Sequence, residues 1–147
     1  MKQEKASILL IENDNLLCDL IQLSLEQEGY SVIVLRSGKE VLNTIERVHP
    51  NLVLLDIFLP QTQTIQLIEQ IQQLPPPKVN IIVLSAFSFR EVVQKALDAG
   101  AKEYLLKPID TVLLMQRVGK LLAITPLPIE KEQKVIEKPV FRTIHNK

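Results

Sequence analysis

The fold is decided by the stretch N-L-V-L-L-D-I-F-L-P, which spans residues 51–60. Its apolar residues 52–55 form an unbroken run of strand length, which is typical of a parallel strand buried on both faces. The run ends at Asp56, and open α/β sheets build their sites at the carboxyl ends of their strands. Taken alone, Asp56 favours the simpler interpretation of a turn residue that ends the strand.

The composition is that of an ordinary globular domain. The chain has 147 residues, 46% of them hydrophobic, so it is long enough for one buried core. The formal net charge is zero, so no general attraction to nucleic acid or an anionic membrane is expected. No long apolar segment follows the N-terminal residues, so we expect a cytoplasmic protein without signal peptide or membrane span. The single cysteine, Cys18, is expected to be a small core residue in a reducing compartment.

Apolar runs and helical periodicity alternate along the chain. We predict five strands, at residues 7–11, 31–35, 52–56, 79–84 and 103–106, each followed by an amphipathic helix. This alternation over short connections predicts an α/β fold with a doubly wound, five-stranded parallel sheet, helices on both faces and right-handed crossovers. Periodicity alone does not give the order of the strands.

Local signals mark where several helices begin and end. The pairs Ser37/Glu40 and Ser88/Glu91 have the S-x-x-E spacing of a capping box, which predicts a helix start at each pair. Gly29 supplies the left-handed residue that commonly stops a helix. The first helix is expected to turn five residues toward the core, namely Leu17, Leu20, Ile21, Ser24 and Leu25.

Residues 125–147 differ from the rest of the chain. Two prolines open this segment, Lys and Glu are mixed through it, and no apolar stripe persists. We therefore divide the chain into a domain at 1–124 and a C-terminal tail at 125–147, which is expected to be flexible.

Polar residues stand at the ends of four predicted strands. They are Glu12, Asn13, Asp56, Ser85 and Lys107. In a parallel sheet these ends meet at one edge, so the side chains are expected to lie together. Carboxylates suit Mg²⁺, and a lysine with a hydroxyl suits a phosphoryl group. The pattern indicates attack by Asp56 on a phosphoryl donor to give an acyl phosphate, although Lys107 and Ser85 would singly be ordinary surface and strand-end residues.

Four motifs at these strand ends carry a resemblance to a known family. They are I-L-L-I-E-N-D (8–14), L-L-D-I-F-L-P (54–60), I-I-V-L-S-A (81–86) and G-A-K-E-Y-L-L-K-P (100–108). Any one of them is a weak signal, but all four occur in order. From about residue 6 to 124 the chain resembles the receiver domain of two-component response regulators, here of the single-domain type. The resemblance implies a flavodoxin-like receiver fold with the strand order 2-1-3-4-5.

The resemblance also implies a role for each residue of the constellation. Asp56 would be the phosphoacceptor, and Lys107 its ion-pairing partner, positioned by a cis peptide bond to Pro108. Ser85 would be the hydroxyl that follows the phosphoryl group, and Tyr104 the aromatic switch residue that turns inward with it. The ligands of Mg²⁺ would be Glu12, Asn13, Asp56 and the backbone carbonyl of Phe58.

The implied partners are proteins. A sensor histidine kinase or a phosphotransfer protein would supply the phosphoryl group, and a downstream protein effector would respond to it. Direct binding to nucleic acid or a membrane is not expected. The chain would not be an enzyme beyond self-catalysed phosphorylation and dephosphorylation.

The chain departs from the family pattern at two places. The family usually has two acids after the first strand, whereas this chain has Glu12 and the neutral Asn13, so Mg²⁺ loses one anionic ligand. Asp14 could compensate in part, but its position suits a helix cap better. The usual glycine-containing turn after Pro60 is replaced by residues 61–64, Q-T-Q-T, so the resemblance does not predict the conformation of that loop.

Three functions therefore compete. The first is a phosphoacceptor signalling switch that acts through protein contacts. The second is a pseudo-receiver that binds partners without phosphorylation, because Asn13 weakens the metal site. The third is a flavodoxin-like cofactor enzyme, which the anionic loop after the first strand disfavours because it would repel a phosphate. Phe87 and Phe89 precede the fourth helix, and we expect one ring to pack inward and an exposed ring to mark a partner surface.

Overall fold

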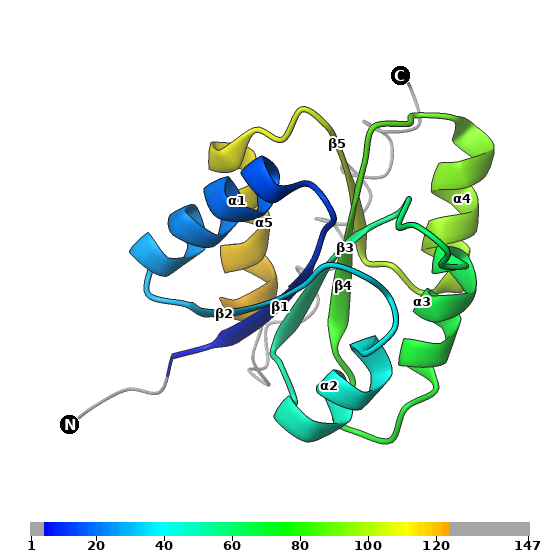
Figure 1. The fold of residues 1–147 in the computed structure, drawn as a ribbon, viewed down its shortest axis with the longest axis horizontal. Coiled ribbons are helices and arrows are strands. Elements are labelled where there is room, and N and C mark those ends of the chain that lie inside the picture. Colours follow the sequence, from blue (N-terminus) through cyan, green and yellow to red (C-terminus); the bar gives the residue numbers. More distant parts are fainter. Residues whose placement is uncertain (1–4, 124–147) are drawn as a thin grey trace.

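The computed structural model describes residues 5–123, which form one parallel sheet covered by helices on both faces (Figure 1). The strand order is β2-β1-β3-β4-β5, so the predicted fold class and order are confirmed. The strands are β1 (Ser7–Ile11), β2 (Ser31–Leu35), β3 (Leu52–Asp56), β4 (Asn80–Ser85) and β5 (Glu103–Leu106). Only β4 differs from its predicted bounds, 79–84. It begins and ends one residue later, so Ser85 is its last residue.

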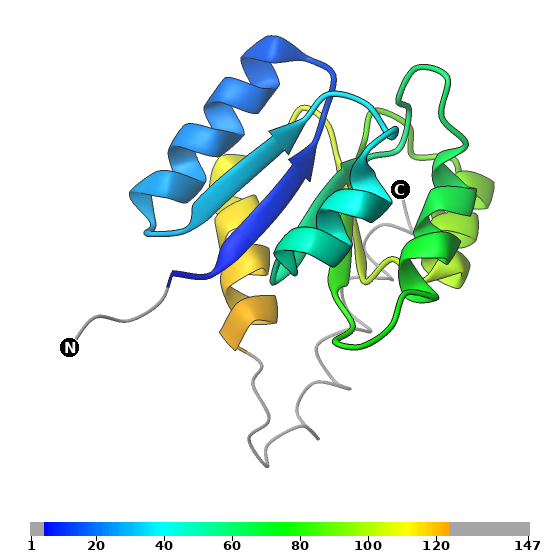
Figure 2. The same ribbon diagram turned by 60° about the horizontal axis from the view of Figure 1, so that its bottom comes forward.

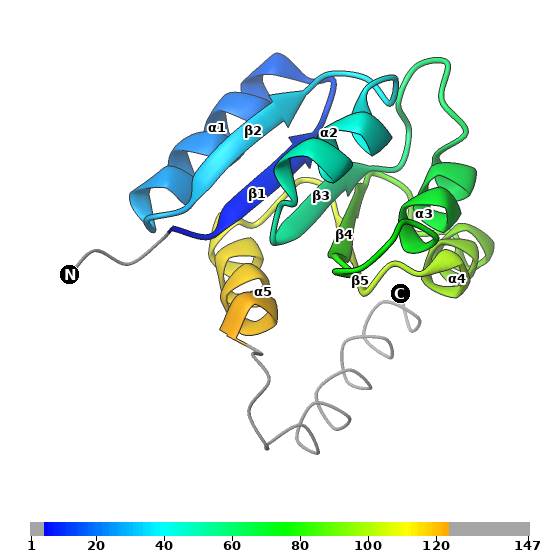
Figure 3. The ribbon, with the colours of Figure 1, turned by 90° about the horizontal axis from the view of Figure 1, so that it is seen from below.

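The helices form two layers. They are α1 (Asn15–Gln27), α2 (Val41–Val48), α3 (Thr64–Gln72), α4 (Arg90–Ala99) and α5 (Thr111–Ala123). Helices α1 and α5 cover one face of the sheet, and α2, α3 and α4 cover the other (Figures 2 and 3). This arrangement divides the core into two apolar layers separated by the sheet.

The central strand β3 explains this division. Val53 and Leu55 pack in the layer beneath α2, α3 and α4, whereas Leu52 and Leu54 pack in the layer beneath α1 and α5. All four are fully buried, because successive side chains of a strand point to opposite faces. Each such side chain stabilises the fold by roughly 1.5–3 kcal/mol through burial. The register is thereby fixed, and Asp56 is carried to the carboxyl edge of the sheet, opposite Leu84.

The helix ends agree with the sequence signals in part. Asp14 caps α1, since its Oδ1 accepts a hydrogen bond of 3.1 Å from the backbone N–H of Leu17. Gly29 has φ +96°, as expected of a left-handed stop after this helix. Both predicted capping boxes are wrong. Helix α2 begins after Glu40 and α4 begins after Phe89, and neither residue makes a side-chain cap hydrogen bond.

A local turn explains the first of these errors. The Ser37 hydroxyl accepts a weak hydrogen bond of 3.4 Å from the backbone N–H of Lys39, so it stabilises a turn and does not cap a helix.

The loop after Pro60, which contains no glycine, has a defined conformation. Gln61 takes the left-handed conformation, with φ +54°, and the Thr62 hydroxyl donates to the carbonyl of Pro60 at 2.9 Å. A non-glycine residue thus accepts the strained position of the turn.

Two predicted placements of apolar side chains fail. Leu20 is not in the core but 47% exposed, because α1 turns Cys18, Ile21 and Leu25 toward the sheet. Phe87 and Phe89 are both exposed, so neither ring packs inward. Cys18 is a buried core residue as predicted, and burial raises the pKa of its thiol.

The segment 125–147, which we expect to be a flexible tail, lies outside the described residues. Within residues 5–123, no helix is both long enough and apolar enough to span a bilayer.

Candidate functional site

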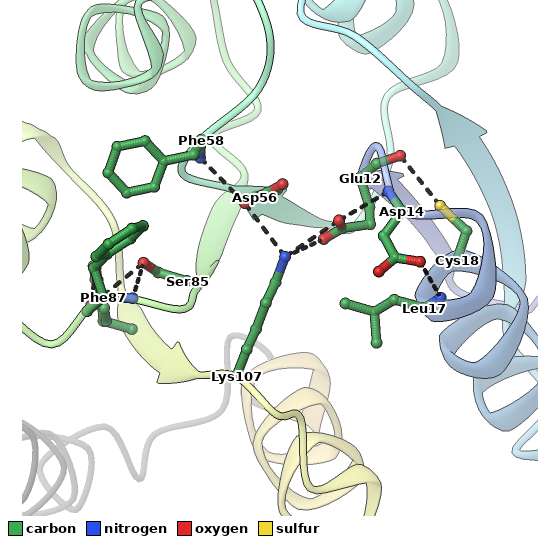
Figure 4. A network of polar contacts seen from close by, with 10 residues as sticks. Glu12, Asp14, Leu17, Cys18, Asp56, Phe58, Ser85, Phe87 and Lys107 are labelled. Atoms are coloured by element: carbon green, nitrogen blue, oxygen red, sulfur yellow. Dashed lines mark hydrogen bonds and ion pairs between the residues drawn. The ribbon is translucent and has the colours of Figure 1, made fainter.

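The polar residues of the strand ends lie along the carboxyl edge of the sheet. Glu12 follows β1, Asp56 ends β3, Ser85 ends β4 and Lys107 follows β5. Figure 4 shows the Lys107 side chain extending between the two carboxylates, with Ser85 and Phe87 to one side. Side chains that are far apart in sequence therefore share one site because the strands run parallel.

Lys107 is the charge partner of both acids. Its Nζ lies 3.1 Å from Oε1 and 3.2 Å from Oε2 of Glu12, and 3.5 Å from Oδ1 of Asp56. The backbone holds this lysine in place, because its N–H donates to the carbonyl of Ser85 at 2.7 Å. The peptide bond to Pro108 is cis, as the resemblance implies. Two buried carboxylates thus share one ammonium group.

Asp56 is buried and hydrogen-bonded to the loop that follows it. The backbone N–H of Phe58 donates to Oδ1 at 3.1 Å. Burial raises the pKa of Asp56 above its ordinary value, and the nearby Glu12 carboxylate adds to this shift. The Phe58 N–H and the Lys107 ammonium oppose it without cancelling it. The anion is therefore held in a state of raised free energy, which makes it more basic and a better nucleophile.

The loop that follows β1 orients the carboxylate of Glu12. Its Oε2 accepts a hydrogen bond from the backbone N–H of Asp14 at 3.1 Å, in addition to that from Lys107. Its buried Oε1 accepts no hydrogen bond, although Nζ of Lys107 lies near it. A buried carboxylate oxygen without a hydrogen-bond donor is suited to bind a cation.

The oxygen donors at this edge fit Mg²⁺. Two carboxylates face one another, and Mg²⁺ typically takes one or two carboxylates and keeps several waters. The neighbouring residues Asp14 and Asn13 add no further anion to the set. Asp14 is engaged as the cap of α1, and Asn13 is exposed and neutral. Within residues 5–123, no group of three or more His, Cys, Asp or Glu side chains is arranged to hold a metal ion, so a cation bound here would have at most two anionic ligands, Glu12 and Asp56.

Ser85 and Tyr104 form a neutral cluster around the backbone of Phe87. The Ser85 hydroxyl accepts from the N–H of Phe87 at 2.9 Å and lies 3.3 Å from its carbonyl, to which it can donate. The Tyr104 hydroxyl donates to the same carbonyl at 2.7 Å. The ring of Tyr104 is fully buried, and this burial raises the pKa of its hydroxyl, which stays a donor. The two residues implied to be switches therefore both hold the loop after β4.

Three exposed aromatic rings cover this loop and the one beside it. The Phe58 and Phe87 rings meet edge to face with centroids 4.7 Å apart, and Phe89 stacks on Phe87 at 5.8 Å. We call these residues the aromatic cluster. Sequence reasoning assigned a role to the Phe58 carbonyl but missed its ring. The available signal was that three of the four phenylalanines of the chain lie in the two loops after β3 and β4.

Comparisons with known proteins agree with this geometry. The family model described as the response regulator receiver domain matches residues 8–119. An uncharacterised 14.6 kDa protein of Leptolyngbya boryana is 35% identical over 112 residues, which cover 76% of this chain and 86% of that protein. The transcriptional regulatory protein ZraR of Salmonella typhimurium is 34% identical over 125 residues. This match covers 85% of the chain but 28% of ZraR, so the chain spans less than a third of that relative.

Solved structures show the same relationship. A putative response regulator from Chloroflexus aurantiacus has a TM-score of 0.76 and 29% identity, covering 82% of this chain and 99% of that one. A CheY-like receiver domain from Methanospirillum hungatei also has a TM-score of 0.76, with 30% identity, and covers 81% of this chain and 94% of that one. With the strand order and the family match over most of its length, the chain belongs to the response regulator receiver domain family.

Proposed function

We propose that this chain is a phosphoacceptor switch of a two-component phosphorelay, phosphorylated on Asp56. The observation that carries the proposal is the position of Asp56. It is a buried carboxylate at the end of the central strand, with Lys107 Nζ 3.5 Å from Oδ1 and the N–H of Phe58 on the same oxygen. The receiver family belongs to two-component signalling, which supports the same reaction.

The reaction is a transfer of a phosphoryl group to a carboxylate oxygen of Asp56. A new P–O bond forms, the bond from phosphorus to the donor's leaving atom breaks, and its electron pair departs with the leaving group. The product is an acyl phosphate on Asp56. Lys107 faces the reacting carboxylate and would offset the negative charge of the phosphoryl oxygens.

Mg²⁺ would be held by the carboxylates of Glu12 and Asp56, with the side-chain oxygen of Asn13 and the backbone carbonyl of Phe58 as neutral ligands. When bound, the ion neutralises charge that develops on the transferred group. Glu12 is suited to this role because its Oε1 is buried and accepts no hydrogen bond.

The effect of phosphorylation would pass through Ser85 and Tyr104 to the loop that contains Phe87. Both hydroxyls contact the backbone of Phe87, whose ring lies in the exposed aromatic cluster. A change in the hydrogen bonding of Ser85 would therefore move an apolar surface. We propose that a downstream protein effector reads this surface.

We further propose the setting in which this switch acts. A sensor histidine kinase or a phosphotransfer protein would supply the phosphoryl group in the cytoplasm. Residues 1–124 would form the receiver unit, without direct binding to nucleic acid and without enzymatic activity beyond its own phosphorylation and dephosphorylation.

A second candidate function is a pseudo-receiver that binds partners without phosphorylation. One specific observation favours it. Asn13 is neutral, and Asp14 is engaged as the helix cap, so the cation would have two anionic ligands where the family usually has three. If this loss is severe, Mg²⁺ would bind too weakly for transfer.

Mass spectrometry under native conditions, with beryllium fluoride and Mg²⁺ as a phosphoryl mimic, separates these candidates. We expect a metal-dependent complex in the native protein and in Asp98→Asn, which changes an exposed acid of α4. Asp56→Asn should abolish both this complex and labelling by a small phosphodonor, while the circular dichroism spectrum is kept. Undiminished labelling of Asp56→Asn would refute the assignment of Asp56, and absence of any complex in the native protein would favour the pseudo-receiver.

A further inference from the structure

The outward face of α1 carries an apolar stripe. Leu16 is 81% exposed, Leu20 47% and Leu23 56%. Their spacing of four and three residues puts them in one row along the helix, on the side away from the sheet. Isolated exposed leucines are common, but a row of three on one helix indicates an interaction surface. We call these three residues the leucine stripe.

The charges beside the leucine stripe are negative. Asp19 lies three residues after Leu16, and Glu26 three residues after Leu23, so both border the stripe. The helix residues 15–27 contain no lysine or arginine. Arg36, from the loop after β2, donates a hydrogen bond to Asn15 in the first turn of the helix. The surface is therefore apolar with an acidic margin.

This charge pattern selects the kind of occupant. Two copies of the chain that packed through their α1 helices would bring the acidic margins together, which is unfavourable. A segment with apolar side chains and positive charges would fit better. Such a segment exists in the chain itself, at residues 134–147, K-V-I-E-K-P-V-F-R-T-I-H-N-K. It has four Lys or Arg residues against one Glu, and five apolar residues among them, namely Val135, Ile136, Val140, Phe141 and Ile144.

The length of the chain permits this contact. Helix α5 ends at Ala123 and lies on the same face of the sheet as α1 (Figure 1). Ten residues, 124–133, connect it to the basic segment, and an extended chain of that length spans up to about 35 Å. Helix α1 is about 20 Å long. An extended connection is therefore longer than α1 itself, which permits residues 134–147 to lie along this helix.

We propose that residues 134–147 bind in cis to the leucine stripe of α1. Their apolar side chains would cover Leu16, Leu20 and Leu23, and Lys138 and Arg142 would pair with the acidic margin. The contact does not depend on phosphorylation of Asp56, so it stands or falls separately from the proposed function.

Paramagnetic broadening in the full chain tests the proposal. A nitroxide is attached at Thr143→Cys, and the buried Cys18 is protected from the label. We expect strong loss of amide peak intensity at Leu16, Leu20 and Leu23, while amides of α4 on the other face of the sheet, such as Lys95, keep theirs. The double variant Lys138→Glu/Arg142→Glu should restore the peaks, as should Leu20→Ser/Leu23→Ser in the stripe.

Three results would overturn the proposal. Amides of α1 that stay sharp would show that the segment does not bind there. Broadening that survives both sets of substitutions would show that the stated chemistry is not the cause. A mixture of isotope-labelled chain without nitroxide and unlabelled chain with nitroxide reports contacts between copies, and broadening in that mixture would mean that a second copy is the occupant.

Discussion

The carboxyl edge of the sheet has two halves that are built differently. In the charged half, Nζ of Lys107 lies 3.1 Å from a carboxylate oxygen of Glu12 and 3.5 Å from one of Asp56. In the neutral half, Ser85 and Tyr104 hold the Phe87 backbone by hydrogen bonds of 2.7–3.3 Å. The first half is held together by ion pairs, so its energy depends on charge. The second half carries no charge and ends in the exposed aromatic cluster.

This difference assigns a separate task to each half. Buried ions interact strongly, and removal of one partner leaves an uncompensated charge, so the charged half resists change until a new charge arrives. A neutral hydrogen bond contributes only about 0.5–1.5 kcal/mol, so the loop of Phe87 can rearrange at small cost. A new charge on Asp56 would therefore act on the charged half and be read through the neutral half.

The largest effect is expected from Lys107→Ala. The substitution leaves two buried carboxylates without their shared cation, which should destabilise the metal-free protein by about 1–3 kcal/mol. It should also impair the response to phosphorylation, because the cation that faces the phosphoryl group is lost. Chemical denaturation in chelator and peak shifts of the Phe87 loop on addition of beryllium fluoride measure the two effects.

Lys120→Ala is the matched control, since Lys120 is an exposed lysine of α5. This substitution should change neither the stability of the metal-free protein nor the peak shifts of the Phe87 loop. If Lys107→Ala also behaved like the native protein in both assays, Lys107 would be an ordinary surface residue. Its ion pairs with Glu12 and Asp56 would then have no role in stability or in the response to phosphorylation.

A smaller effect is expected from Asn13→Asp. It adds a third anion beside Glu12 and Asp56, so Mg²⁺ should bind more tightly, by up to about tenfold, which corresponds to 1.4 kcal/mol. The same charge should lower the stability of the metal-free protein through repulsion. Titration of Mg²⁺ followed by thermal unfolding measures both changes, and phosphorylation at limiting Mg²⁺ should rise.

Asn43→Asp makes the same chemical change at an exposed position of α2, away from the site, and should leave Mg²⁺ affinity unaltered. Equal affinities in the native protein and Asn13→Asp would mean that Asn13 is not near the metal. A pseudo-receiver would then no longer be favoured by a weakened metal site.

The sequence predicted the architecture well because its signals are local and strong. The unbroken run 52–55 and the alternation of strands with helices are sufficient for a doubly wound sheet. The strand order came from the resemblance, not from periodicity. Glu12, Asp56 and Lys107 could be placed together because parallel strands bring their carboxyl ends to one edge.

What failed depended on tertiary geometry that a sequence pattern does not contain. The spacing of Ser37 and Glu40 allows a capping box. However, the Ser37 hydroxyl accepts a hydrogen bond from the backbone N–H of Lys39, two residues further on, and so stabilises a local turn. Leu20 belongs to an apolar pattern, yet it is exposed, because α1 faces the sheet with Cys18, Ile21 and Leu25. The rings of Phe58 and Phe87 come from different loops, so their contact could not be predicted from either loop alone.

A modest stabilisation is expected from Asp56→Asn in the absence of metal. Burial and Glu12 raise the pKa of Asp56 in the folded protein. An acid with a raised pKa binds its proton more tightly when folded, so the free energy of unfolding falls as pH rises from its ordinary pKa of 3.8 through the folded value. The asparagine variant lacks this loss and should be more stable at pH 7, by about 2–4 °C in thermal midpoint.

The pH dependence provides the check. The advantage of Asp56→Asn should shrink as the pH is lowered toward 3.8, because the native carboxyl then becomes neutral as well. Asp98→Asn, in α4, serves as the control for a general charge effect. A variant that is less stable than the native protein at pH 7 in chelator would contradict the interpretation that Asp56 is a strained anion.

The smallest effect is expected from Tyr104→Phe, which removes one hydrogen bond of the neutral half. The hydroxyl of Tyr104 donates to the carbonyl of Phe87 at 2.7 Å, and the Ser85 hydroxyl can still reach that carbonyl at 3.3 Å. The loss should therefore be only about 0.5–1 kcal/mol, and labelling of Asp56 should persist. Amide exchange of Phe87 and its neighbours should accelerate, whereas Tyr30→Phe, which changes the only other tyrosine, should leave it unaltered. Unchanged exchange in Tyr104→Phe would show that the tyrosine is ordinary filling of β5, and that Ser85 alone connects the charged half to the aromatic cluster.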